Sequence, residues 1–348
     1  MNNNRLLQEL IRKKTIVKTS PFTEMVVSLH VLYRPEHHVY RVEWAAHLNE
    51  TLPQSLINEW NELGEWTHEW LAILDAETEP KWSVTPMETI QQIQQMPEAE
   101  FLQILFNQRF SLSQILLWMR GQDETWKTTL NDRQKTALHQ PTKIRRRIVS
   151  ALKQYWDESF QQEWRLIEPW LVKAEQDFTE KVERNGVQAL AQLHPRLYVK
   201  EDGLYMQKAT MYRYPYQEIK RIVVRPSSFV HPHLLIGYKD GIVTVPLDVR
   251  VPGSVKSGGV PADLIRMFKT LSDETRLKIV HSLYTQPHCT QQLAQIHQVS
   301  EAAISKHLKM LVEANYVTTE RRGNYVFYRL VPEEVEMILV YLRQFLEQ

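Results

Sequence analysis

Cysteine is almost absent from this chain, which contains one, Cys289, in 348 residues. A single thiol excludes an internal disulfide and is too few for a zinc ribbon or an iron–sulfur cluster. No uninterrupted apolar run approaches the roughly eighteen residues that cross a bilayer, and the N-terminal residues lack the order of a secretory signal. These absences predict a soluble, cytoplasmic protein with no membrane partner, and they exclude secreted and metal-stapled classes.

Motifs of well-known catalytic chemistry are also missing. The sequence has no G-x-S-x-G, no phosphate-binding Walker loop and no dinucleotide glycine pattern. His68-Glu69 begins like H-E-x-x-H but continues as Trp70-Leu71 without a second histidine. We therefore predict that the chain is not an enzyme and holds no cofactor. Catalytic residues need not be neighbours in sequence, so a fused enzymatic domain of unfamiliar type stays open.

Charge is nearly balanced overall but is unevenly distributed along the chain. The net charge of +1 combines an excess of four cations over 1–20, of eight acidic residues over 21–194 and of five cations over 195–260, with balance over 261–348. Between residues 276 and 331, seven cations accompany three acidic residues. The length predicts two or three domains, and the basic segment near the C-terminus is where contact with nucleic acid is expected.

Residues 1–194 are predicted to form a mostly helical, tryptophan-rich domain. Apolar residues recur there with helical spacing in two stretches. These are Leu63, Trp66, Trp70, Ile73 and Leu74, and then Ile144, Ile148, Leu152 and Trp156. Prolines at 53, 86, 97, 141, 169 and 195 are expected at first turns or between helices. The ten tryptophans either fill the core of this domain or line a pocket for an apolar or planar ligand.

Residues 195–252 are predicted to form a small antiparallel β region. Short β-branched and aromatic runs alternate with Asp-Gly pairs at 202–203 and 240–241, which favour tight hairpins with positive φ at both central residues. A Gly- and Ser-rich stretch over 253–260 predicts a flexible linker, and residues 261–348 are predicted to form a C-terminal domain. The expected fold class is mainly α with α+β elements.

The C-terminal domain carries the pattern of a helix-turn-helix. The sequence predicts helices over 262–271, 276–284, 290–296 and 301–314, with Ser272, Thr290 and Ser300 as the caps of the last three. The apolar side of the second helix is expected to be Leu277, Val280, Leu283 and Tyr284. In the last helix one buried stripe is expected from Ile304, Leu308, Leu311 and Val312, which leaves Glu301, Ala302, Ser305, Lys306 and Lys309 outward. A polar, cationic face of this width suits the major groove of DNA.

Two strands and a final helix are expected beyond these helices. Strands over 316–321 and 325–330 predict a hairpin, the wing, with Arg321 and Arg322 at its tip. Arginines there reach phosphate or the minor groove and contribute salt-dependent affinity. From Pro332 the sequence predicts a helix whose apolar stripe is Val335, Ile338, Leu339, Leu342, Phe345 and Leu346. Because the stripe is too long for so small a module to cover, a second copy of the chain is the simplest partner.

Three motifs of this domain resemble the ArsR-type winged-helix transcriptional regulators in order and spacing. They are residues 268–277 (FKTLSDETRL), 299–311 (VSEAAISKHLKML) and 321–330 (RRGNYVFYRL). Residues 20–30 (SPFTEMVVSLH) are similar to the long N-terminal region of some larger members. The resemblance covers about the last quarter of the chain. It implies a winged helix-turn-helix homodimer that binds a palindromic operator and releases it when a signal binds.

The sequence departs from the metal-sensing members of that family at both of their metal locations. Where those members carry Cys-Val-Cys, this chain has Cys289-Thr290-Gln291, and residues 333–348 contain no His or Asp. A soft or borderline metal needs several converging thiolates or imidazoles, so we predict no metal site. Glu301 stands where members often have Gln, and it either accepts from a cytosine amino group or complements the helix N-terminus.

The predicted function is a homodimeric transcriptional repressor whose partner is double-stranded operator DNA. Residues expected near base edges are Ser300, Glu301, Ala302 and Ser305. Residues expected on the DNA backbone or in the wing contact are Thr290, Lys306, His307, Lys309, Arg321, Arg322, Asn324 and Tyr325. The N-terminal region is expected to sense an unknown non-metal small-molecule effector or to form the dimer. The alternative is a ligand-binding or enzymatic N-terminal domain with the winged helix as its output module.

Three further features have two interpretations each. Cys289 is either a small packed side chain or a redox switch. His231 and His233 flank Pro232 and share one side of a strand, but two imidazoles without a third ligand make a weak metal site. The cations Lys143, Arg145, Arg146 and Arg147 either pair with their acidic domain or form a second phosphate track.

Overall fold

The structure is a computed structural model in which two compact units are found. It describes residues 2–35, 38, 41–77, 85–207, 211–231, 235–251, 262–314, 316–322, 325–332, 334–335, 338–339 and 342. The first unit contains residues 1–204 and 214–256, and the second contains residues 205–213 and 257–348. The fold is mainly helical with small sheets, as predicted. Among the described helices, none is both long and apolar enough to span a membrane.

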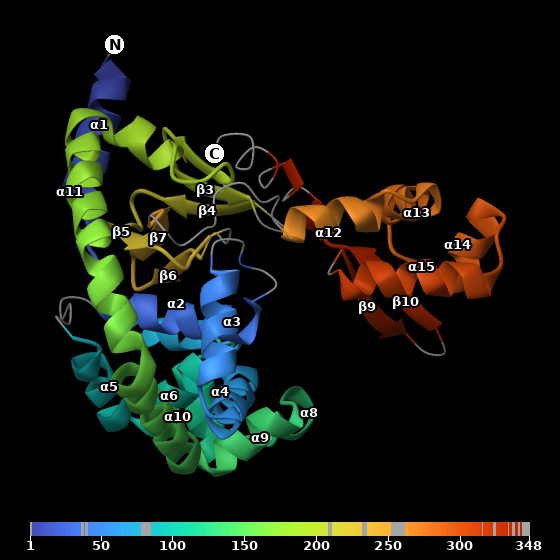
Figure 1. The fold of residues 1–348 in the computed structure, drawn as a ribbon, viewed down its shortest axis with the longest axis horizontal. Helices are drawn as coiled ribbons and strands as arrows, with labels where there is room; N and C mark the ends of the chain where they lie inside the picture. The colour runs from blue at the N-terminus through green and yellow to red at the C-terminus, as the bar shows by residue number, and fades with distance from the viewer. Residues whose placement is uncertain are drawn as a thin grey trace. The chain divides into compact units, whose positions relative to one another are not determined.

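Helices make up most of the first unit (Figure 1). They are α1 (Asn2–Lys14), α2 (Pro21–Tyr33), α3 (Val42–Thr51), α4 (Gln54–Trp66), the 3-10 helix η2 (Leu71–Ala76), α5 (Pro86–Gln95), α6 (Glu98–Leu105), α7 (Leu112–Met119), α8 (Trp126–Thr129), α9 (Asp132–His139), α10 (Pro141–Tyr155), the π-helix η3 (Trp156–Phe160) and α11 (Gln161–Ala191). Pro86 and Pro141 are first residues of helices, as predicted, because the first turn needs no backbone N–H. Pro169 instead lies inside α11, where it supplies no backbone N–H. The backbone of α11 also departs from helical angles at Asn185, with φ −155° and ψ 80°.

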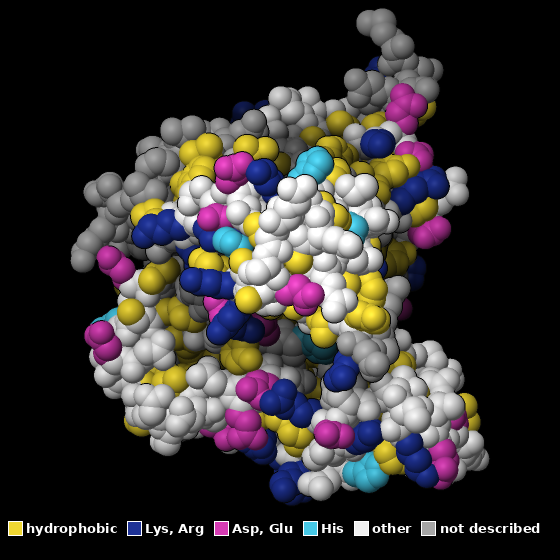
Figure 2. Space-filling model, turned by 90° about the vertical axis from the view of Figure 1, so that its right-hand side faces the viewer, with side chains coloured by type: hydrophobic (Ala, Val, Ile, Leu, Met, Phe, Trp, Pro, Cys, Tyr) yellow, Lys and Arg dark blue, Asp and Glu magenta, His cyan; other side chains and the backbone are white. Residues whose placement is uncertain are grey.

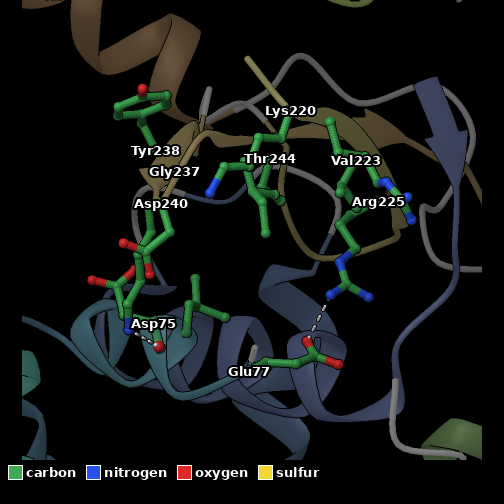
Figure 3. A pocket seen from close by; sticks show the side chains of 13 residues that line it. Asp75, Glu77, Lys220, Val223, Arg225, Gly237, Tyr238, Asp240 and Thr244 are labelled. Carbon is green, nitrogen blue, oxygen red and sulfur yellow. Dashed lines mark hydrogen bonds and ion pairs between the residues drawn. The ribbon is translucent and has the colours of Figure 1, made fainter. Parts of the chain in front are cut away.

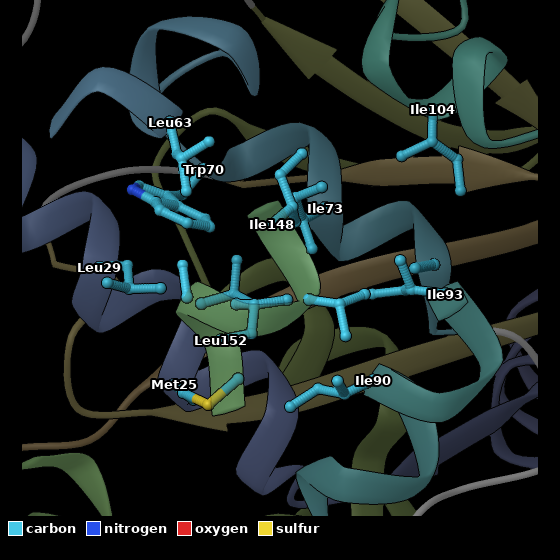
Figure 4. Packing of buried hydrophobic residues seen from close by; sticks show 14 of the residues in the cluster. Met25, Leu29, Leu63, Trp70, Ile73, Ile90, Ile93, Ile104, Ile148 and Leu152 are labelled. Atoms are coloured by element: carbon cyan, nitrogen blue, oxygen red, sulfur yellow. The ribbon is translucent and has the colours of Figure 1, made fainter. Parts of the chain in front are cut away.

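The helices of the first unit pack around one large apolar core (Figure 4). The stripe predicted along α10 is confirmed, since Ile144, Ile148 and Leu152 are all buried, and Trp156 follows them in η3. Buried tryptophans of this core are Trp60, Trp70, Trp118, Trp156 and Trp164. These five side chains therefore fill the core, which is the first of the two interpretations of the tryptophan-rich composition.

The first predicted helical stretch, from Leu63 to Leu74, is interrupted in the structure. Helix α4 ends at Trp66, and the backbone then has positive φ at His68, Glu69 and Trp70 before η2 begins. The Trp70 side chain is fully buried, and its indole nitrogen donates to the carbonyl oxygen of Trp60 at 3.1 Å. Burying the indole in this way turns the chain back on α4, so one helix cannot continue through residues 67–70.

Two sheets contain the strands of the region predicted to be β, residues 195–252, and one of them also includes a strand from outside that region, β1. One has the strand order β1 (Thr15–Val17), β5 (Arg221–Ser227), β7 (Ile242–Asp248), β6 (Gly237–Lys239), and the other has the order β2 (Leu197–Lys200), β3 (Gly203–Gln207), β4 (Met211–Pro215). The hairpin predicted at 240–241 is confirmed, because β6 and β7 are antiparallel and both turn residues have positive φ. The four-stranded sheet also contains parallel pairs, since β1 and β7 both run parallel to β5.

The Asp-Gly pair at 202–203 acts differently from the prediction. Neither residue has a positive φ. A Cβ at Gly203 would lie 2.5 Å from the carbonyl oxygen of Tyr214. Glycine is therefore required there by a close approach of two backbones.

The segment 20–30 forms the start of α2 and is buried almost throughout. Ser20 caps the helix, with its side-chain oxygen accepting from the Thr23 backbone N–H at 3.0 Å. Glu24 is fully buried, and its carboxylate accepts from the backbone N–H of Ser228 at 2.7 Å and from the hydroxyls of Ser227 and Ser228. Burial raises the pKa of Glu24, and these hydrogen bonds oppose the rise. The polar residues of this segment thus bind α2 to the residues at the end of β5.

The second unit contains the predicted helix-turn-helix and wing. Its elements are α12 (Ala262–Leu271), α13 (Glu274–Thr285), β8 (His288–Cys289), α14 (Thr290–His297), α15 (Glu301–Glu313), β9 (Val317–Arg322) and β10 (Tyr325–Leu330). The strands form a sheet of order β8-β10-β9. In the predicted final helix, Val335, Ile338, Leu339 and Leu342 are helical. Phe345, Leu346 and the linker predicted over 253–260 lie outside the described residues.

Candidate nucleic-acid interface

Helices α14 and α15 are joined by a short turn that the local sequence specifies. Gln298 adopts the left-handed conformation with φ 56° and ψ 40°, and it ends α14. The backbone N–H of Val299 then donates to the carbonyl of Ala294 at 3.1 Å. Ser300 caps α15 as predicted, because its side-chain oxygen accepts from the Ala303 N–H at 3.2 Å. The N-terminus of α15 is therefore fixed relative to α14.

One side of α15 is buried and the other is exposed, as the apolar spacing predicted. Ile304, Leu308 and Leu311 are each 0% exposed, while Val312 is half-buried. The predicted outward residues Glu301, Ala302, Ser305, Lys306 and Lys309 are all exposed. Lys309 lies over the next turn of the helix, with its Nζ 3.8 Å from a carboxylate oxygen of Glu313. This side of α15 is polar and accessible, and it carries two lysines.

His307 lies apart from that outward side. Its side chain is 21% exposed, and its Nδ1 is 3.6 Å from a carboxylate oxygen of Asp273, which precedes α13. Asp273 in turn accepts from the backbone N–H of Arg276 at 2.9 Å, and this bond is the main reason that its pKa is lowered. The structure thus places His307 against the start of α13. The sequence predicted instead that this side chain contacts a DNA phosphate.

The cap of α13 is Asp273, and the predicted cap Ser272 is wrong. The Asp273 side chain accepts from the N–H of Arg276, whereas the Ser272 hydroxyl donates to the carbonyl of Lys269 at 2.9 Å. A carboxylate at this position also complements the positive end of the helix dipole. Helix α13 therefore begins at Glu274, two residues before the predicted start at Arg276.

The predicted apolar side of α13 is also partly wrong. Leu283 is buried as expected, but Leu277 is 49% and Tyr284 is 75% exposed. The buried positions of the helix are Arg276, Ile279 and Leu283. Arg276 takes the place expected of an apolar side chain because its guanidinium donates to the carbonyls of Lys269 and Thr270. This arginine thereby connects the end of α12 to the start of α13.

The cap of α14 is Cys289, and the predicted cap Thr290 is the first residue of the helix. Cys289 is extended, because it pairs with Phe327 of β10, and its backbone N–H donates to the side-chain oxygen of Gln292 at 2.9 Å. Its thiol is buried, as the packed-side-chain interpretation predicts. Thr290 is half-buried at the N-terminus of α14.

The wing is a two-stranded antiparallel hairpin, as predicted, but Arg322, which was expected in the turn, is the last residue of β9. Arg321 pairs with Val326, and Arg322 pairs with Tyr325 at the tip. Arg321 is exposed and Tyr325 is 52% exposed. The side chain of Arg322 and the whole of Asn324 lie outside what the structure describes. The described part of the wing thus presents a cation and an aromatic ring at its end.

His231, considered as a metal ligand, and Arg147, considered as part of a second basic track, both have structural partners. His231 is buried, with its Nδ1 3.0 Å from a carboxylate oxygen of Asp248, and His233 lies outside the described residues. Within the described residues, no three His, Cys, Asp or Glu side chains gather in a metal-binding arrangement.

Arg147 donates to Glu59 and Glu62 at 2.8 to 3.0 Å. Arg147 therefore pairs within its own acidic domain. The face drawn in Figure 2 carries basic, acidic and hydrophobic side chains interspersed.

Comparisons with known proteins match two separate parts of the chain. A family model described as "Bacterial regulatory protein, arsR family" matches residues 273–319, and one described as "Family of unknown function (DUF5937)" matches residues 7–248. An arsenical resistance operon repressor of Bacillus subtilis (strain 168) is 38% identical over 73 residues, which cover 21% of this chain and 70% of the repressor. The chain therefore belongs to both families.

Two further relatives match the same arsR-family part. A cadmium resistance transcriptional regulatory protein CadC homolog of Staphylococcus aureus is 34% identical over 80 residues, covering 23% of this chain and 66% of the homolog. Among solved structures, an ArsR-like transcriptional regulator from Rhodococcus sp. RHA1 is 32% identical, with a TM-score of 0.23, covering 24% of this chain and 79% of that one. This arsR-family chain is a DNA-binding transcriptional regulator, and its first 248 residues include a domain of unknown function.

Proposed function

We propose that the second unit binds a palindromic operator as a homodimer and represses transcription, with α15 in the major groove. The observation that carries this proposal is the division of α15 into a buried apolar side and an exposed polar side. The major groove admits one helix, whose N-terminal residues reach base edges. In this position Ser300, Glu301, Ala302 and Ser305 lie near bases. Such a partner implies that the protein works in the cytoplasm, where bacterial operators are.

Backbone contacts are assigned to the cations and to the helix N-terminus beside α15. Lys306 and Lys309 are exposed on the outward side, and Thr290 lies at the start of α14. Arg321, with Arg322, Asn324 and Tyr325, belongs to the wing, which reaches phosphate or the minor groove. His307 contributes to the same site by a different route, because it holds the start of α13 beside the N-terminal half of α15.

Salt dependence of DNA binding tests this assignment. Duplexes bound by the full chain are selected from a random pool, and affinity is measured by fluorescence anisotropy over a series of salt concentrations. Lys306→Ala should weaken binding to all duplexes alike and reduce the slope of log affinity against log salt by about one, because one phosphate contact is lost. Lys278→Ala is the matched control, since Lys278 is an exposed lysine of α13 paired with Glu274. An unchanged slope for Lys306→Ala would count against this docking of α15.

Dimerisation is proposed from apolar side chains that the second unit leaves exposed. Ile265 and Phe268 of α12 are 39% and 47% exposed, and Leu339 of the final segment is 71% exposed. A second copy of the chain covers such surface and matches the two-fold symmetry of a palindrome. Phe268→Glu should give a monomer in light scattering after size-exclusion chromatography. Ile296→Glu, at a residue of α14 that is 52% exposed, should stay dimeric, and a dimeric Phe268→Glu protein would refute this interface.

The N-terminal region is proposed to sense a non-metal small molecule, with the winged helix as its output. The observation favouring this role over a purely structural one is a cavity of about 400 Å³ in the first unit, a volume within the range of small-molecule sites. Regulation requires that the ligand prefer one of two conformations of the protein. An effector is thus expected to change operator affinity of the full chain.

A further inference from the structure

The cavity of the first unit lies on one face of the four-stranded sheet. The opposite face packs against α1 and α11 in a second apolar cluster, separate from the large core of the helices. Strand residues alternate between the two faces. Ile222 and Val224 of β5 are fully buried in the second apolar cluster, with Val243 and Val245 of β7. The cavity is lined from the other face by the residues between them, Arg221, Val223, Arg225, Ile242 and Thr244. The residues Leu74, Asp75 and Glu77, at the end of η2, complete its wall.

One end of the cavity is built around a buried ion pair. Arg225 Nη2 is 3.1 Å from a carboxylate oxygen of Glu77, and their side chains are 8% and 4% exposed. Glu77 also accepts from the hydroxyls of Ser20 at 2.8 Å and Thr23 at 2.7 Å. The charges of Glu77 and Arg225 therefore balance each other, and two donors from the start of α2 complete the partners of the carboxylate, so the pair adds little net charge of either sign to the cavity.

Three further cations, Lys220, Arg221 and Lys239, line the cavity with two further carboxylates, Asp75 and Asp240. Lys239 Nζ donates to the backbone carbonyl of Asp75 at 3.2 Å, and burial raises the pKa of the Asp75 carboxyl. Lys220 extends between the Asp75–Asp240 side and the Arg225–Glu77 side (Figure 3). In all, four cations and three carboxylates line the space, together with the apolar side chains Leu74, Val223 and Ile242.

The backbone around Gly241 positions Lys220 over this space. Lys220 N–H donates to the carbonyl of Gly241 at 2.7 Å. Gly241 has a φ of 86°, and a Cβ there would lie 2.9 Å from Cγ of Lys220. The stem of Lys220 thus runs across a glycine that no other residue can replace without moving it. This packing places the stem of Lys220 along the wall of the cavity.

We propose that this cavity binds a small organic monoanion, a carboxylate attached to an apolar body. The carboxylate would lie at Lys220, toward Arg225, and the apolar body against Leu74, Val223 and Ile242. A charge-assisted hydrogen bond favours the anion over its neutral amide, and the apolar wall favours an organic acid over inorganic phosphate. The inference rests on the proposed sensing role of the N-terminal region and adds the chemical class of its ligand.

Benzoate and benzamide test the proposal as a matched pair that differs in charge. Isothermal titration calorimetry is carried out on the full chain without DNA, with inorganic phosphate as a third titrant. Benzoate should bind, and benzamide and phosphate should bind at least tenfold more weakly. Lys220→Gln should weaken benzoate binding roughly tenfold, while Lys181→Gln, a change at an exposed lysine of α11, should leave it unchanged. Equal binding of benzamide, equal binding of phosphate, no binding of benzoate, or an unaffected Lys220→Gln protein would each overturn it.

DNA affinity measured on the same preparations separates this proposal from the proposed function. Both lysine variants should bind the selected duplex as the unchanged chain does in the absence of benzoate. If DNA binding fails while benzoate binds, the docking of α15 is wrong and the cavity assignment stands. If DNA binds while benzoate does not, the cavity assignment alone is overturned.

Discussion

Arg276 should be one of the residues on which the second unit depends most for stability. It is 8% exposed, and its guanidinium donates from Nε to the carbonyl of Thr270 and from Nη2 to the carbonyl of Lys269 at 3.1 Å. A hydrogen bond that involves a charged group contributes roughly 1.5 to 3 kcal/mol. Removing both by Arg276→Ala should therefore cost about 3 kcal/mol, because some of the lost contact is offset by the desolvation that the cation no longer undergoes.

Hydrogen exchange followed by mass spectrometry resolves this effect within the intact chain. All ten tryptophans lie in residues 1–194, so tryptophan fluorescence does not report on the second unit. A loss of about 3 kcal/mol should lower the protection of amides in α12 and α13 by a factor of roughly 10². Amides in α10, in the first unit, should keep their protection. In Arg276→Lys the protection of α12 and α13 should lie between that of Arg276→Ala and that of the unchanged chain, because an ammonium cannot reach both carbonyls in the same geometry.

The matched control is Lys278→Ala, which removes an exposed cation two residues away. Exposed ion pairs contribute only about 0 to 1 kcal/mol, so this variant should exchange almost as the unchanged chain does. The reasoning would be refuted if Arg276→Ala left α12 and α13 as protected as before. It would equally be refuted if Arg276→Ala and Arg276→Lys showed the same amide exchange.

Three further changes test other parts of the fold. Leu308→Ala, at a fully buried position of α15, should destabilise the second unit by about 2 to 5 kcal/mol, which denaturant dependence of amide exchange would measure. Gly241→Ala should destabilise the first unit by about 1 to 3 kcal/mol, since φ is 86° and a Cβ would lie 2.8 Å from the Glu218 carbonyl; an unshifted thermal transition would contradict this. His297 Nε2 is hydrogen-bonded to the hydroxyl of Ser282 at 3.0 Å. Burial is the main reason that the pKa of His297 is lowered. The unfolded chain therefore takes up a proton more readily, so the stability of the second unit should fall as pH drops below about 6.5, and His297→Gln should abolish this pH dependence.

The winged helix could be predicted in detail because its determinants are local. A stripe such as Ile304, Leu308 and Leu311 is decided by helical spacing within one turn-and-helix unit, and the cap Ser300 stands directly before it. The errors in this unit are also local competitions. Ser272 and Asp273 are both good caps, and the carboxylate of Asp273 is favoured by the helix dipole. The burial of Arg276 cannot be predicted from the sequence, because its carbonyl partners lie in the preceding helix and no apolar pattern reveals them.

The first unit was harder to predict because its determinants are far apart in sequence. Strand β1 has three residues, Thr15 to Val17, and pairs with β5 more than two hundred residues later. Three residues are too few for a period of two to be recognised. The break after Trp66 depends on where the Trp70 indole finds its partner, which is a matter of packing. Tertiary contacts therefore override the local preference in both places.

The cavity shows the same limit at the level of function. Its walls come from two stretches, 74–77 and 220–244, that are separated by most of the first unit. No sequence motif marks Glu77 as a cavity residue, and Arg225 is one cation within a β-branched strand. Their meeting at the cavity therefore cannot be predicted from the sequence. They meet because α2, through Ser20 and Thr23, holds Glu77 in place. The motif at residues 20–30 is thus explained by what it supports: a helix start whose hydroxyls fix one carboxylate, which in turn fixes one buried arginine of the sheet.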